Sequence, residues 1–105
     1  MKPFFVLLIL SVLVVTRPAS AANGSGLEIK SVYYCSTDFS MMMSNGERWV
    51  VLKSQVGAEK LGHFISMAMF MMAAGKKTNN VFPGEPISWC GNSNVRPIHI
   101  LSFEN

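Results

Sequence analysis

A polar run after the second cysteine, residues 91–97, holds the side chains best suited to binding chemistry. Its amides, hydroxyl and guanidinium could bond the hydroxyl groups of a sugar, and the indole of Trp89 could cover the apolar face of the ring. Affinity at one such site is weak, and several linked sites would multiply it. The alternative is a plain turn that joins two strands. The residues that we predict to bind a glycan are Trp89, Asn92, Ser93, Asn94 and Arg96.

Catalytic groups are sparse outside this run. The four carboxylates away from the termini are scattered over predicted turns, the two histidines are far apart, and no glycine-rich phosphate loop or metal-binding helix motif is present. The cysteines and histidines also lack the spacing of a structural metal site. We therefore expect no enzymatic activity, no cofactor and no resident metal. We interpret His99 as a strand residue and His63 as a residue of a helix surface or interface.

The methionines suggest a different chemistry. Met41 and Met43 would point to the same side of a strand, with Trp49 across the hairpin from them. Thioether and imidazole together suit Cu(I). Met67, Met69 and Met71, by contrast, diverge around a helix axis and cannot converge on one ion. Copper binding is thus an alternative to the ordinary role of methionine as an adaptable core filler.

The N-terminus and the cysteines together indicate export. Lys2 is followed by the apolar stretch 4–15 and by Ala19-Ser20-Ala21, the order of parts in a cleaved signal peptide. The apolar stretch is shorter than the roughly 20 residues that a spanning helix needs. We predict a signal peptide over residues 1–21, a single domain over 22–105 without a membrane span, and a secreted or periplasmic location. Cys35 and Cys90 would then form a disulfide, with free thiols or a metal pair as the alternatives.

Removal of this leader changes the charge of the chain. The full sequence has 9 Lys and Arg against 6 Asp and Glu, and the leader carries Lys2 and Arg17, so that 7 remain against 6. The remaining domain is nearly neutral and has no basic stripe that could neutralise phosphates. We therefore expect no nucleic-acid partner.

We predict that the elements that position these residues are several strands and one helix. Residues 27–35 alternate, and Asn45-Gly46 between two β-rich runs predicts a hairpin of residues 39–43 and 48–53. Residues 58–74 have helical spacing and end at Gly75, and two further strands are expected at 81–90 and 97–103. The order β-β-β-α-β-β predicts a mainly β fold, the five-stranded OB-fold barrel, with one disulfide.

The predicted helix is apolar on more than one side. A core stripe of Leu61, Phe64, Ile65, Ala68, Met69 and Met72 accounts for one face only. The segment is too short to span a bilayer, so that a second subunit is the favoured cover, with loops of a monomer as the alternative. The residues that we predict at an oligomer interface are His63, Met67, Phe70, Met71 and Ala74.

In this layout the chain resembles the small OB-fold B subunits of bacterial AB5 toxins, of the cholera and heat-labile enterotoxin kind, and exported proteins related to them. The features that carry the resemblance are the leader, early Cys35, a long helix before Cys90, the run Cys-Gly-Asn-Ser-Asn-Val-Arg-Pro at 90–97, and a short closing strand. The resemblance implies a ring of five subunits whose helices line a pore, a host glycan as ligand, and a separate enzymatic A chain. The cholera-type pattern has Trp and Lys where this chain has Asn92 and Val95, so that its ganglioside pocket is not implied.

The sequence as a whole predicts an exported, non-enzymatic, ring-forming protein that binds cell-surface glycans. A small periplasmic interaction or inhibitor domain, with the apolar helix docked on another protein, is the alternative. A Cu(I)-binding chaperone comes third.

Overall fold

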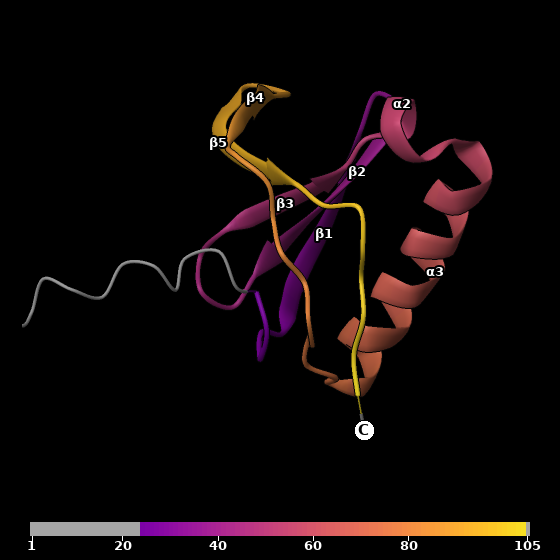
Figure 1. Cartoon of the computed structure of the whole chain (residues 1–105), viewed down its shortest axis with the longest axis vertical. Helices are drawn as coiled ribbons and strands as arrows, with labels where there is room; N and C mark the ends of the chain where they lie inside the picture. Colours follow the sequence, from indigo (N-terminus) through magenta and orange to yellow (C-terminus); the bar gives the residue numbers. More distant parts are fainter. Residues whose placement is uncertain (1–23, 105) are drawn as a thin grey trace, which may run out of the picture.

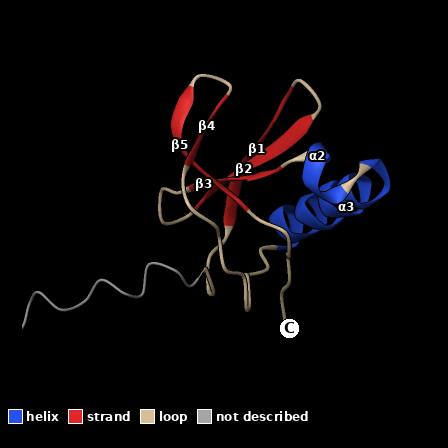
Figure 2. Ribbon diagram, turned by 45° about the horizontal axis from the view of Figure 1, so that its top comes forward, coloured by secondary structure: helices blue, strands red, loops and turns tan. Residues whose placement is uncertain are grey.

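The computed structural model describes residues 24–104, so that the predicted signal peptide over residues 1–21 lies outside the described residues. One long helix runs along one face of a five-stranded sheet (Figures 1 and 2). The mainly β fold and the element order β-β-β-α-β-β are confirmed, with one extra helical turn before the long helix. No helix within residues 24–104 is long and apolar enough to cross a membrane. The elements are β1 (Ile29–Cys35), β2 (Asp38–Met43), β3 (Arg48–Val51), α2 (Lys53–Val56), α3 (Ala58–Ala74), β4 (Ile87–Trp89) and β5 (Asn92–Pro97).

The predicted hairpin and helix both form with the expected signals at their ends. Between β2 and β3, the Gly46 amide donates to the Met43 carbonyl at 2.9 Å, and Gly46 has a φ of 93°. Glycine adopts that region without steric cost, which explains the turn. Helix α3 ends at Gly75 with a φ of 69°, and the Lys76 amide donates to the Met71 carbonyl at 3.0 Å.

The sheet is open rather than a closed barrel. Its strand order is β1-β2-β3-β5-β4, with β3 and β5 parallel and the other neighbouring pairs antiparallel. The outer strands β1 and β4 are not paired with each other in this order. A disulfide between Cys35 and Cys90 is formed, as predicted, and it joins the last residue of β1 to the turn that follows β4.

The last strand does not lie where the sequence predicts it. Cys90 and Gly91 both have positive φ, at 44° and 82°, so that the chain reverses in two residues. The polar run that we expected to be a loop is therefore β5, and Asn92 pairs directly with Trp89. The expected strand at 97–103 is an extended segment with a single bridge, from Phe103 to Thr78.

Alternation along the strands divides the side chains between two faces of the sheet. The face toward α3, which we call the helix face, holds the main core, and the opposite face, which we call the open face, holds a small second cluster of Val50, Trp89 and Val95. Met69 was predicted in the core stripe of α3 but is 43% exposed. The core residues from the strands and the helix are Ile29, Phe39, Met41, Met43, Trp49, Val51, Leu61, Ala68 and Met71.

Candidate functional site

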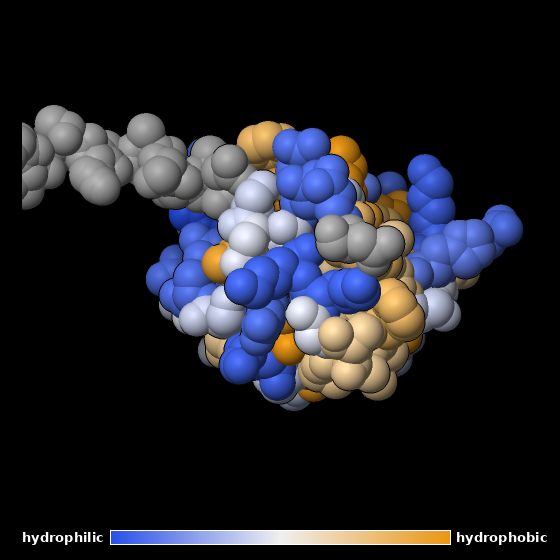
Figure 3. Space-filling view, turned by 90° about the horizontal axis from the view of Figure 1, so that it is seen from below, coloured by the Kyte–Doolittle hydropathy of each residue, from blue (hydrophilic) through white to orange (hydrophobic). Residues whose placement is uncertain are grey.

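Helix α3 leaves most of its surface uncovered. Only Leu61, Ala68 and Met71 of its 17 residues are buried, although residues 61–74 carry no charged side chain. Met69 and Phe70 are 43% and 52% exposed. Figure 3, seen from the end where α3 stops, shows apolar surface gathered over that end beside hydrophilic surface. An unpartnered apolar face of this kind is typical of an interaction surface.

The predicted interface residues fall in three environments. His63, Phe70 and Ala74 are exposed, and Met67 is half-buried. Met71, in contrast, is fully buried in the main core, so that it stabilises the fold and is not available to a partner. Met71 lies on the same face of α3 as the buried Ala68, because residues three apart in a helix share a face.

Trp89 is not the sugar platform that the sequence suggests. Its side chain is only 7% exposed and packs with Val50 and Val95. The indole nitrogen donates to Asp38 Oδ2 at 3.1 Å, and its ring meets Tyr33 edge to face with 5.7 Å between centroids. A sugar therefore has no open indole face to stack on.

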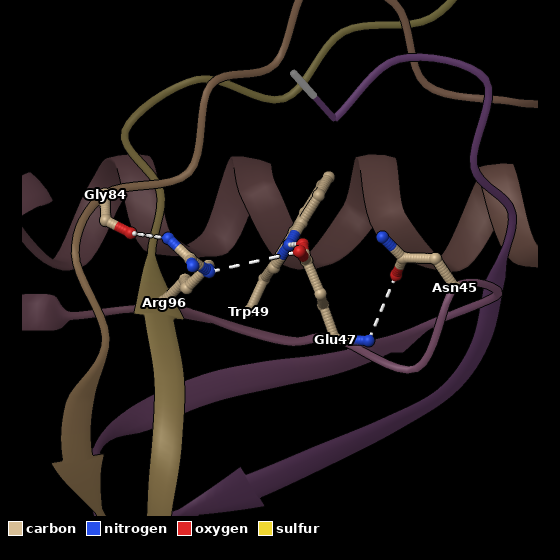
Figure 4. A network of polar contacts seen from close by, with 5 residues as sticks. All are labelled: Asn45, Glu47, Trp49, Gly84 and Arg96. Carbon is tan, nitrogen blue, oxygen red and sulfur yellow. Dashed lines mark hydrogen bonds and ion pairs between the residues drawn. The ribbon is translucent and has the colours of Figure 1, made fainter. Parts of the chain in front are cut away.

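Arg96 is also engaged within the fold. Its Nη1 donates to the Gly84 carbonyl at 2.9 Å, and its Nε lies 3.9 Å from Glu47 Oε2. The other oxygen of Glu47 accepts from the indole of the buried Trp49 at 3.0 Å, as Figure 4 shows. Arg96 thereby links β5 to the loop before β4 and to the hairpin of β2 and β3.

The remaining predicted glycan residues stay at the surface. Ser93 and Asn94 are exposed on β5, and Asn92 is half-buried with its side-chain nitrogen 3.5 Å from the Cys90 carbonyl oxygen. Of the set predicted from the sequence, Ser93 and Asn94 are thus the residues that a ligand could reach without rearrangement.

Two exposed tyrosines, which the sequence did not single out, lie close to this region. Tyr33 and Tyr34 are 45% and 58% exposed on β1, and the Arg48 guanidinium lies 5.4 Å from the centre of the Tyr33 ring. Their exposure follows from the position of β1 at the sheet edge. Because strand order is a long-range property, the sequence of β1 alone carries no signal for it.

The disulfide brings the two outer hairpins together. The Cα atoms of Cys35 and Cys90 are 6.6 Å apart, and Figure 2 shows the turn after β1 and the turn after β4 at the same end of the molecule. We call the two turns at 36–37 and 90–91, together with the strand ends that carry Tyr33, Tyr34, Ser93 and Asn94, the bridged tips.

The methionines proposed for copper lie in the main core. Met41 pairs with Trp49 across the hairpin, as expected, but Met41, Met43 and Trp49 are all essentially inaccessible to solvent. They fill the core rather than surround an open position. Within residues 24–104, no group of three or more His, Cys, Asp or Glu side chains could hold a metal ion.

His63 and His99, far apart in the sequence, line one cleft. The cleft has a volume of about 280 Å³ and lies between α3 and the segment that follows β5. Figure 1 shows that segment running alongside α3 toward the C-terminus. The lining residues are Lys60, His63, Phe64, Met67, His99, Ile100 and Leu101.

Comparison with known proteins finds no relative. No protein-family model matches the chain, and neither the curated proteins nor the solved structures include a significant match.

Proposed function

We propose that this chain is an exported, non-enzymatic binding protein that assembles with further copies of itself through α3, in the manner of a toxin B subunit. The observation that carries the proposal is the exposed apolar side of α3, above all Met69 and Phe70. Burying one such side chain contributes about 1.5–3 kcal/mol. Because residues 61–74 carry no charge, like-charge repulsion does not oppose the approach of identical helices.

The sheet supports an OB-type architecture for this protein. Five strands with a helix between the third and fourth, and a sheet that is partly open, are features of the OB-fold. The disulfide holds the two outer strands together where the barrel would close. A small domain that has a disulfide and an exposed apolar helix is typical of a protein that buries its remaining apolar surface by oligomerisation. The resemblance to the toxin subunits favours five copies.

The bridged tips are the best-supported place for a glycan. In OB-folds the turn between the first two strands and the turn between the last two commonly bind oligosaccharides. In this chain the same two turns are joined by Cys35 and Cys90. Tyr33 offers an exposed ring, and Ser93 and Asn94 offer hydrogen-bonding groups. Tyr33 thus replaces Trp89 as the aromatic residue of the proposed site.

Light scattering on the purified protein tests the assembly. We expect one defined mass, a small multiple of the single chain, and a shift to the monomer in Phe70→Glu and Met69→Glu, because each places a charge in the interface. Phe82→Glu is the matched control, since Phe82 is 59% exposed but lies outside α3. Far-UV circular dichroism confirms that each variant is folded. A monomeric unsubstituted protein would contradict the proposal and would favour docking of α3 on a different protein.

A further inference from the structure

The cleft between α3 and the segment after β5 has a charge pattern that the assembly does not require. Lys60, His63 and His99 bring three nitrogen groups that can carry positive charge, and none of the seven lining residues is acidic. The remaining wall is apolar, with Phe64, Met67, Ile100 and Leu101. The cleft therefore combines three basic side chains with an apolar lining.

The local sequence builds this combination from two elements. Lys60, His63 and Met67 are spaced by three and four residues, so that they form one strip along α3. His99 lies on the segment after β5, which faces that strip. The arrangement depends on the docking of this segment along α3, where Phe70 and Phe103 also meet with 5.6 Å between ring centroids.

We propose that this cleft binds a small amphipathic carboxylate, with the carboxylate at Lys60, His63 and His99 and the apolar body against Phe64 and Met67. Ligand sites commonly consist of an apolar wall with a few convergent polar groups. A volume of about 280 Å³ lies near the lower end of the roughly 300–1,000 Å³ that is usual for small-molecule sites. That size matches a medium-chain fatty acid or a simple aromatic acid.

An NMR titration of the purified protein with octanoate tests this proposal. We expect shifts in the signals of His63, Met67 and His99, which line the cleft. The His63→Gln/His99→Gln variant should bind octanoate roughly tenfold more weakly than the unsubstituted protein. Both positions are exposed, so that the variant should fold. Lys77→Gln, which removes an exposed charge beyond the end of α3, should bind like the unsubstituted protein.

Four results would overturn the proposal. Octanol, which lacks the charge, could bind as tightly as octanoate. The double variant could bind octanoate as tightly as the unsubstituted protein does. Octanoate could shift Met69 and Ala73 on the exposed side of α3 instead of the cleft. The cleft signals could shift with protein concentration alone, which would show that a second copy occupies the cleft.

Discussion

The Trp89 indole donates a hydrogen bond to Asp38 Oδ2 at 3.1 Å. This bond connects β4 to the start of β2 on the open face of the sheet. The other oxygen of Asp38 accepts from the Lys53 amide at 2.8 Å, at the first residue of α2. One carboxylate therefore holds three elements, β2, β4 and α2, in a fixed relation.

Asp38→Ala should lower the free energy of unfolding by about 1–3 kcal/mol, because it leaves the indole nitrogen of the buried Trp89 without its partner. Asp38→Asn keeps an acceptor and should cost less. Urea denaturation of both variants measures the difference. Glu59→Ala, which removes a carboxylate from an exposed position on α3, is the control and should change stability little. Equal losses for Asp38→Ala and Asp38→Asn would contradict the role given to this hydrogen bond.

Loss of the disulfide should lower the free energy of unfolding more than loss of the Asp38 carboxylate does. Cys35 and Cys90 are 55 residues apart, and the chain-entropy model assigns about 4 kcal/mol to a crosslink of that length. We expect Cys35→Ser/Cys90→Ser to lose a large part of its stability. Near-UV circular dichroism should also change, because Cys35 packs against the cluster that contains Trp89, whose ring contacts Tyr33. A double serine variant with unchanged denaturation midpoint and spectrum would refute this prediction.

Glu47 and Arg96 should contribute unequally to the free energy of unfolding, although they form an ion pair. Both side chains are 27% exposed and the charged atoms are 3.9 Å apart, and such a pair contributes about 0–1 kcal/mol. Glu47 also accepts from the fully buried Trp49 indole at 3.0 Å, so that Glu47→Ala should cost about 1–3 kcal/mol. Arg96→Gln should cost less than Glu47→Ala in thermal or chemical denaturation. The reverse order would show that the ion pair dominates the network.

Glycan binding should depend on Tyr33 and the neighbouring polar residues. In a glycan array followed by titration of the best ligand, Tyr33→Ala should weaken binding about tenfold, since a stacked aromatic ring is a frequent hot spot. Ser93→Ala should have a smaller effect in the same direction. Arg96→Gln is the control, because its guanidinium is already bonded to Gly84. A folded Arg96→Gln variant that loses binding, or an array without any ligand, would contradict the placement of the site at the bridged tips.

The sequence predicts the local elements well and their pairing less well. Helix α3 was predicted over residues 58–74, as observed, because apolar spacing and Gly75 are local signals. The Asn45-Gly46 hairpin and the pairing of Cys35 with Cys90 were predicted on similarly direct grounds. The last strand was misplaced because Cys90, a residue that rarely has positive φ, forms the turn together with Gly91.

The candidate site was harder to predict because exposure depends on contacts between distant elements. Trp89 packs with Val95 of its hairpin partner β5 and with Val50 of β3, and only the parallel pairing of β3 with β5 brings Val50 near it. Tyr33 is exposed because β1 is an outer strand, and the cleft exists because the segment with His99 returns along α3. Each of these relations is set by tertiary structure and has no signature in the local sequence.

The bridge between Cys35 and Cys90 also restrains the two outer strands of the sheet. The backbone groups along the outer sides of β1 and β4 are not paired with each other, and unpaired strand edges are templates for aggregation. The bridge ties these edges at one end, which restricts how far they can separate to accept a strand from another molecule. In a reducing compartment the edges would be released, so that the solubility of the chain should depend on the redox state of the place where it folds.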